Sequence, residues 1–112
     1  MKAIKLCMAA LLLLAASTTF ATERAHSSTL KFVYPFANGD FVIGFDTDPS
    51  TCTAAGTPKY LYVSVGQNGV TATGSAKLFA AAMAAFLARS TVSAAFDDAT
   101  SNCYVNRFSV QD

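Results

Sequence analysis

One stretch decides the fold: Thr71-Ala-Thr-Gly-Ser-Ala-Lys-Leu-Phe-Ala-Ala-Ala-Met-Ala-Ala-Phe-Leu-Ala-Arg89. After the first 21 residues, it is the only part of the chain in which apolar side chains recur with the 3.6-residue period of a helix. We therefore predict one helix over residues 71–89, with Thr71 or Ser75 as its N-cap. At about 100° per residue, one apolar stripe is expected to pack on a sheet, and it consists of Ala76, Phe79, Ala82, Met83, Phe86 and Leu87.

The opposite side of this predicted helix is nearly all alanine, and Lys77 is almost its only charge. A helix face in water normally carries Glu and Lys, whereas small side chains let another backbone approach closely. This side therefore predicts self-association or docking of a partner, and the high helix propensity of alanine is the alternative explanation. The predicted oligomer face consists of Ala80, Ala81, Ala84, Ala85 and Ala88.

The first 21 residues have the organisation of a secretory signal peptide. Lys2 and Lys5 precede an apolar run from Leu6 to Ala16, and small residues lead to a cleavage site after Ala21. The run is about half as long as the ~20 apolar residues that a membrane span needs. We expect cleavage near Ala21 and a secreted or periplasmic protein, with an uncleaved anchor as the alternative.

Cleavage changes the charge balance. The full chain has eight Lys and Arg, seven Asp and Glu and a formal net charge of +1, and loss of Lys2 and Lys5 makes this −1. Such a chain offers no basic face for phosphate backbones and no cationic helix for a membrane surface. The composition therefore predicts neither a nucleic-acid partner nor a membrane span.

Cys52 and Cys103 remain after cleavage, because Cys7 belongs to the signal peptide. In an oxidising compartment they are expected to form one disulfide. The segments 45–52 and 96–103 share the pattern Phe-Asp, then Ser, then Cys at identical spacing, so two matching turns would present the sulfurs to each other. Free thiols or a metal pair are the alternatives, but neither cysteine has a His or a second Cys at ligand spacing.

Alternation of apolar and polar residues predicts five strands, over 29–36, 40–46, 59–65, 91–96 and 103–110. Asn38-Gly39 predicts a type I′ hairpin turn, which needs positive φ at both residues. Residues 22–28, which include His26, are expected to form a flexible N-terminal arm before a single domain over 29–112. The following residues are expected to share one face of the first strand: Leu30, Phe32, Tyr34 and Phe36.

The order of three strands, a helix and two strands is that of the OB-fold, a small Greek-key barrel. We therefore predict a mainly β, α+β fold: a five-stranded antiparallel OB-like barrel with one helix between the third and fourth strands. An open antiparallel sheet with one helix across it is the alternative. Phe41, Ile43 and Phe45 are expected to face the core.

No pattern predicts catalysis. His26 lies in the predicted arm, so Ser-His-Asp and Cys-His arrangements lack a positioned base. Four carboxylates, those of Asp46, Asp48, Asp97 and Asp98, follow strands and would lie together if the cysteines are joined. The main explanation is that Asp favours turns, where its side chain bonds the nearby backbone. A Ca²⁺ site or an acid-base pair formed by these carboxylates is the alternative. We expect a chain that is not an enzyme and that needs neither cofactor nor metal.

Binding is better supported. Tyr60 and Tyr62 stand on the more polar face of the predicted third strand, and flat rings with a hydroxyl suit stacking on sugars or filling a protein interface. The alternative is the strand propensity of tyrosine. Asn106 and Arg107 interrupt the last strand and predict a bulge, a binding edge or a solvated face. These four residues are the candidate ligand-binding residues.

Over residues 29–110 the chain resembles the OB-fold B subunits of AB-type bacterial toxins, nearest to the subtilase-cytotoxin type. The resemblance rests on the secreted length, the disulfide, the order of strands and helix, the segment Thr91-Val-Ser-Ala-Ala-Phe96 and the cysteine-bearing last strand. It implies a ring of protomers with helices lining the centre and an outer surface that binds host glycans. None of that family's sugar-contacting residues is matched to a position here.

The sequence thus predicts a secreted, oligomeric, non-catalytic binding module, and the resemblance adds glycans as its ligands. The alternative is a periplasmic or extracellular structural or inhibitory domain that binds another protein. The predicted partners are accordingly further copies of this chain, another secreted protein, or glycans.

Overall fold

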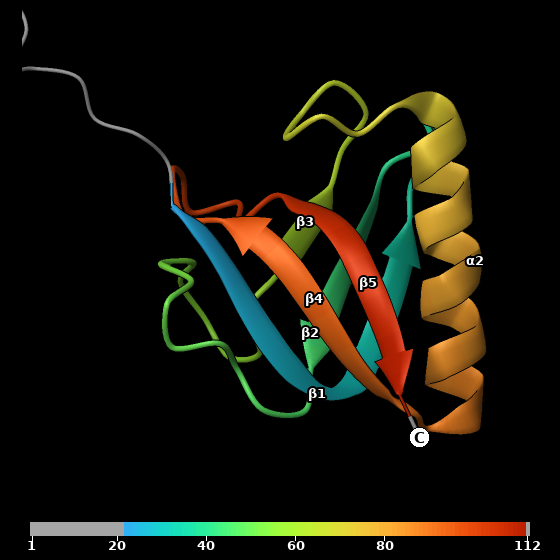
Figure 1. The fold of residues 1–112 in the computed structure, drawn as a ribbon. Coiled ribbons are helices and arrows are strands. Elements are labelled where there is room, and N and C mark those ends of the chain that lie inside the picture. Colours follow the sequence, from blue (N-terminus) through green and yellow to red (C-terminus); the bar gives the residue numbers. More distant parts are fainter. Residues whose placement is uncertain (1–21, 112) are drawn as a thin grey trace, which may run out of the picture.

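Within residues 22–111, five antiparallel strands form one sheet, and one helix packs against it (Figure 1). The computed structural model describes residues 22–111, so the predicted signal peptide lies outside the described residues. The helix stands between the third and fourth strands, which confirms the predicted α+β, OB-like class. The elements are β1 (Glu23–Pro35), β2 (Phe41–Phe45), β3 (Leu61–Val63), α2 (Ala72–Ala88), β4 (Thr91–Asp97) and β5 (Val105–Gln111).

The strand order β3-β2-β1-β4-β5 places the long β1 at the centre of the sheet. Residues 23–29 of β1 pair with β4, and residues 30–35 pair with β2. The two edges of the sheet approach each other, because the Tyr62 N–H in β3 donates to the Asn102 carbonyl, three residues before β5, at 3.1 Å. The sheet is therefore a partly closed barrel.

The predicted N-terminal arm is wrong, because residues 23–28 are the first half of β1. Glu23 lies opposite Asp97 in β4, and the Thr22 N–H donates to a carboxylate oxygen of Asp98 at 2.9 Å. The His26 ring contacts the Phe45 ring edge-on at 4.9 Å and hydrogen-bonds the Thr47 carbonyl. Most of these side chains are polar, so the sequence shows no alternating pattern here. The segment is nevertheless a strand, because its backbone pairs with the neighbouring strand β4.

A β-bulge between Leu30 and Phe32 divides β1 into its two halves. Leu30 is buried in the core, whereas Phe32 lies opposite Gly44 and Tyr34 lies opposite Val42, on the outer face of the sheet. The extra residue reverses which side chains point inward beyond it. The predicted common face for Leu30, Phe32, Tyr34 and Phe36 is therefore wrong.

The β1–β2 turn is longer than the predicted two-residue type I′ turn. The Phe36 N–H donates to the Asp40 carbonyl at 2.8 Å, which leaves three residues at the tip. Of these, Gly39 alone has a positive φ, +95°, while the Asn38 side chain accepts from the Asp40 N–H at 3.0 Å. This three-residue loop with glycine in the left-handed region is another common hairpin connection.

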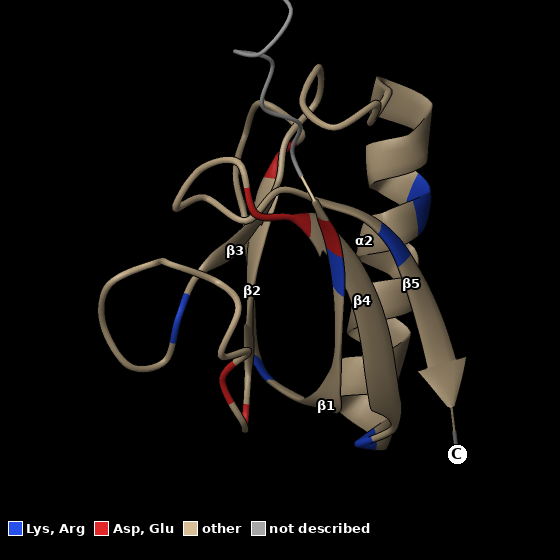
Figure 2. Ribbon diagram, turned by 60° about the vertical axis from the view of Figure 1, so that its left-hand side comes forward, with Lys and Arg blue, Asp and Glu red and all other residues tan. Residues whose placement is uncertain are grey.

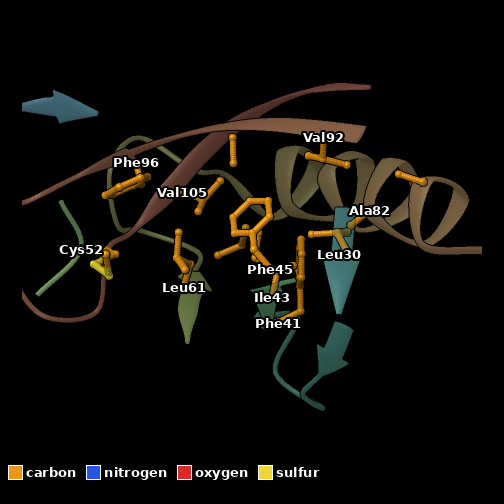
Figure 3. Close-up of a cluster of buried hydrophobic side chains, with 14 of the residues drawn as sticks. Leu30, Phe41, Ile43, Phe45, Cys52, Leu61, Ala82, Val92, Phe96 and Val105 are labelled. Carbon is orange, nitrogen blue, oxygen red and sulfur yellow. A yellow bond between two sulfur atoms is a disulfide. The ribbon is translucent and has the colours of Figure 1, made fainter. Parts of the chain in front are cut away.

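Buried side chains fill the space between the curled sheet and α2 (Figure 3). Phe41, Ile43 and Phe45 face this core as predicted, and the Phe41 ring packs on Phe79 of α2 with ring centres 5.4 Å apart. The predicted disulfide between Cys52 and Cys103 is present at one end of the core, with both residues buried. Its half-cystines are 51 residues apart in the sequence.

Both ends of α2 are fixed to the hairpin and to β1. The Thr71 side chain accepts from the Gly74 N–H, which confirms Thr71 as the N-cap. Ser75, only 1% exposed, donates from Oγ to the Gly39 carbonyl at 2.6 Å. At the C-cap, Arg89 donates to the Leu30 carbonyl at 2.8 Å.

The packed side of α2 is rotated from the predicted stripe. Phe79 and Phe86 contact the core, but Leu87 is 74% exposed. Ala85, predicted on the opposite face, is 1% exposed and lies in the core. The prediction from bulky residues was rotated because two small residues, Ala82 and Ala85, are the apolar residues of α2 that are fully buried in the core.

Candidate functional site

Three aromatic rings gather on the outer face of β1 and the start of β3, and we call Phe32, Tyr34 and Tyr60 the aromatic platform. The Phe32 and Tyr34 rings are stacked, with centres 4.6 Å apart and planes 21° apart. Tyr60 stands edge-on to both, at 5.1 Å from Phe32 and 6.0 Å from Tyr34. Tyr34 is 48% exposed and Tyr60 41%, so two rings of this cluster meet solvent.

β2 leaves room for the platform, because one of its residues next to the rings is a glycine. Gly44 lies opposite Phe32, and a β-carbon there would come within 2.2 Å of the Phe32 ring. Val42, fully buried although it lies on this outer face, is opposite both Tyr34 and Tyr62. Glycine inside a strand is a signal for close approach of another group, and it marks this site in the sequence.

Sequence reasoning found only the β3 part of this site. Tyr60 and Tyr62 were predicted as ligand-binding residues, and Tyr62 is cross-strand from Val42 on the outer face. Phe32 and Tyr34 were missed, because the bulge that turns them outward has no clear signal in their own alternation. Binding by the tyrosines stays a prediction.

The phenol hydroxyls of Tyr34 and Tyr60 take part in none of the hydrogen bonds within residues 22–111. Each of these two hydroxyl groups can donate and accept a hydrogen bond, and both stand at the exposed rim of an apolar ring. Such a surface is apolar across its rings and polar at its edge, which suits a ligand with both kinds of surface.

Asn106 and Arg107 are tied to other parts of the barrel. Asn106 forms the bulge of β5 against β4, and its side-chain amide donates to Asn68 at 3.4 Å. The Arg107 guanidinium pairs with Glu23 at 2.7 Å. Of the three alternatives, a bulge, a binding edge or a solvated face, the structure shows the bulge, while their place in a ligand site stays a prediction.

Of the four carboxylates that follow the strands, Asp46, Asp48 and Asp98 accept hydrogen bonds, whereas Asp97 has a buried oxygen without a partner in the described residues. A hydrogen bond from Thr29 and the Arg89 guanidinium, 2.8 Å away, hold the pKa of Asp46 below its usual value. The Thr22 N–H and the Arg24 guanidinium do the same for the pKa of Asp98. Among residues 22–111 no three His, Cys, Asp or Glu side chains lie close enough together to hold a metal ion.

The arginines of the described part of the chain are paired with carboxylates. Figure 2 shows acidic and basic segments next to one another where β1 begins and β4 ends, with α2 almost free of both. Arg24, Arg89 and Arg107 each form an ion pair, to Asp98, Asp46 and Glu23 respectively.

The outward side of α2 is a second candidate surface. Of the predicted oligomer face, Ala80, Ala84 and Ala88 are exposed, Ala81 is half-buried, and Ala85 belongs to the core. Beside this side, between the β1–β2 hairpin and the first half of α2, lies a mainly apolar pocket of about 240 Å³. Its walls include Phe36, Phe41 and Phe79.

In comparisons with family models, curated proteins and solved structures, the chain matches none of them. Among residues 22–111, α2 does not meet the length and hydrophobicity that a membrane-crossing helix requires.

Proposed function

We propose that this chain is a secreted, non-catalytic binding module that holds a sugar ring on the aromatic platform. The observation that carries the proposal is the half-exposed pair of tyrosines, Tyr34 and Tyr60, kept in place by Phe32 above Gly44. The C–H face of a sugar stacks on an aromatic ring, and its hydroxyl groups bond to polar groups at the rim. Secretion follows from the predicted signal peptide.

Rigidity supports this assignment. Phe32 covers one face of Tyr34, and Val42 lies beneath the rings without any exposed surface. A preformed surface loses little conformational entropy when a ligand binds, which favours affinity from a small contact. OB-fold proteins bind oligosaccharides and oligonucleotides on the face of strands 2 and 3, and the platform lies beside these strands, with Tyr60 directly before β3.

The direct test is a glycan array with the mature protein and three variants. Tyr34→Ala and Tyr60→Ala are each expected to weaken binding to any recognised glycan about tenfold, because stacked area is lost. Val110→Ala, which shortens a similarly exposed apolar side chain on β5, 47% exposed and outside both the platform and α2, is the control and should bind as the parent does. An array without hits, or platform variants that bind normally, would end the proposal.

The alternative is a structural or inhibitory domain that binds another protein or a second copy through α2. The observation in its favour is the apolar side of that helix, where Leu87 is 74% exposed, together with the pocket beside Phe36. Association that is abolished by Leu87→Glu, and is indifferent to Tyr34→Ala, would support it. Oligomerisation and sugar binding are compatible, because α2 and the platform use different surfaces.

A further inference from the structure

We propose that Lys59 is a positioning residue of the aromatic platform, because its hydrogen bonds fix the backbone beside Tyr60 to the segment that carries Cys52. The inference rests on the proposed function, since it explains how one ring of the proposed sugar site is kept in place. It is carried by three hydrogen bonds of Lys59 and by the point at which β3 begins.

Tyr60 stands just outside the paired part of β3. The pairing of β3 with β2 ends at Leu61, which lies opposite Ile43. Continuing this register by one residue places Tyr60 opposite Gly44, so no side chain of β2 separates the Tyr60 ring from that of Phe32, 5.1 Å away. The sheet therefore supports Tyr60 from its C-terminal side, and the N-terminal side depends on other contacts.

Lys59 supplies those contacts. Its backbone N–H donates to a carboxylate oxygen of Asp48 at 2.9 Å. Its ammonium donates to the Pro49 carbonyl at 3.2 Å and to the Cys52 carbonyl. All three acceptors belong to residues 48–52, so a single residue fastens the start of the third strand to one short segment.

The segment that accepts these bonds is itself fixed. Pro49 and Cys52 are buried, and the Cys52 N–H donates to the Pro49 carbonyl at 3.2 Å. Cys52 also forms the disulfide with the buried Cys103. Lys59 thus connects the backbone beside Tyr60 to the end of the core where the disulfide lies.

The chemistry of these contacts fits positioning rather than an ion pair. Among residues 22–111 the ion pairs are formed by Arg24, Arg89 and Arg107, and Lys59 belongs to none of them. An ammonium has three donors, and carbonyl oxygens replace the water that a half-buried ammonium loses. Such charge-assisted hydrogen bonds are stronger than those between neutral groups, so they restrict the backbone that carries Tyr60.

This restriction prepares the Tyr60 ring before a sugar binds. Ordering a side chain on binding costs affinity, so a ring that already lies against Phe32 and Tyr34 binds more tightly than a mobile one. Lys59 therefore acts on the sugar through Tyr60.

The first experiment measures the Tyr60 ring by nuclear magnetic resonance in the mature protein without a ligand. The parent is expected to show nuclear Overhauser effects between the ring protons of Tyr60 and Phe32. Lys59→Met removes the ammonium but keeps a long side chain and the backbone bond to Asp48, and it should lose these effects while the amide signals of β4 stay in place. Lys31→Met is the matched control: it removes the same charge one residue before Phe32, from an exposed side chain outside the ion pairs, and should retain them.

The second experiment uses the tightest-binding glycan of the array. Lys59→Met should weaken its binding about threefold, less than the loss expected for Tyr60→Ala. In the Tyr60→Ala background, Lys59→Met should cause no further loss, because the ring through which it acts is absent. Losses that add in the double variant would show that Lys59 acts directly on the sugar or through stability.

Asp48→Ala provides a second variant if Lys59→Met does not fold. It removes the acceptor of the Lys59 N–H and should weaken the same Overhauser effects. Effects that persist in every folded variant, or that Lys31→Met also abolishes, would overturn this inference and leave the proposed function standing. The expected loss in a protein that binds no glycan would contradict the proposed function and leave the positioning role standing.

Discussion

Phe32 occupies the space above Gly44, where an added β-carbon would lie 2.2 Å from the Phe32 Cε1 atom. The two residues face each other across β1 and β2, and Gly44 is buried. The aromatic platform therefore depends on the absence of a side chain in the neighbouring strand. Position 44 sets both the stability of the sheet and the direction of the rings.

Gly44→Ala is accordingly expected to displace Phe32 and to destabilise the fold by about 1–3 kcal/mol, as overpacking of a closed site does. Urea unfolding monitored by circular dichroism measures the stability, and glycan affinity should fall in the same variant. Gly74→Ala is the matched control, because it lies within α2 at a negative φ and its added β-carbon would meet only the Thr71 side-chain oxygen, at 3.1 Å, so it should change stability by less than about 1 kcal/mol. Equal stability of both variants would contradict the close approach.

Ser75→Ala tests the link between α2 and the hairpin. The hydroxyl donates to the Gly39 carbonyl from a fully buried position, so its removal should cost about 1–2 kcal/mol of the free energy of unfolding. Ser101→Ala removes an exposed hydroxyl and should change stability by less than about 0.5 kcal/mol. A Ser75→Ala protein as stable as the control would show that the hairpin is held by other contacts.

The strands and the helix were predicted well from local patterns. The core-facing side of β2 and the place of α2 in the chain both follow from the period of apolar residues within one segment. The helix was predicted over residues 71–89 with Thr71 or Ser75 as its N-cap, and Thr71 and Arg89 are its N-cap and C-cap. The order of elements then limited the topology to a few arrangements. The disulfide followed from having two cysteines in an oxidising context.

The candidate site was less predictable, because it depends on one inserted residue. The bulge at Lys31 turns Phe32 and Tyr34 outward, and pairing with β4 orders residues 23–29 despite their polar composition. The bulge and the ordering of residues 23–29 both arise from pairing with a neighbouring strand rather than from the sequence of β1 alone. The same holds for Ala85, which is buried because its small size lets α2 approach the sheet.

Stability should decrease in acid through Asp46 and Asp98. Bonds from Thr29 and Arg89 to Asp46, and from Thr22 and Arg24 to Asp98, lower both pKa values in the folded protein. A lowered pKa adds stability above the unfolded-state value of about 4, and this stability is lost as the pH falls toward the folded-state values. Urea midpoints of the parent between pH 6 and about pH 2.5 measure the loss. The double variant Asp46→Asn, Asp98→Asn should show a smaller decrease, and identical pH profiles would contradict this account.

Reduction of the Cys52–Cys103 disulfide should cost roughly 4 kcal/mol, the chain-entropy value for a closed loop of about 50 residues. Urea unfolding with and without a reductant measures this difference. A Cys52→Ala, Cys103→Ala variant should be as unstable as the reduced protein and indifferent to reductant. Coincident unfolding curves of the oxidised and reduced parent would show that the loop is already restricted in the unfolded chain.

Self-association is expected through the exposed side of α2, where Leu87 stands 74% exposed beside Ala80 and Ala84. Small side chains permit close contact between two such helices, and Leu87 adds apolar area to be removed from water. Weak interfaces are populated at protein concentrations of tens of micromolar. Light scattering at such a concentration should therefore give an oligomeric mass. Leu87→Glu and Ala84→Glu should each give a folded monomer, since both positions face solvent, while Thr100→Glu, exposed but outside this side, should not change the mass. A parent protein that is monomeric under these conditions would leave α2 with a packing role only.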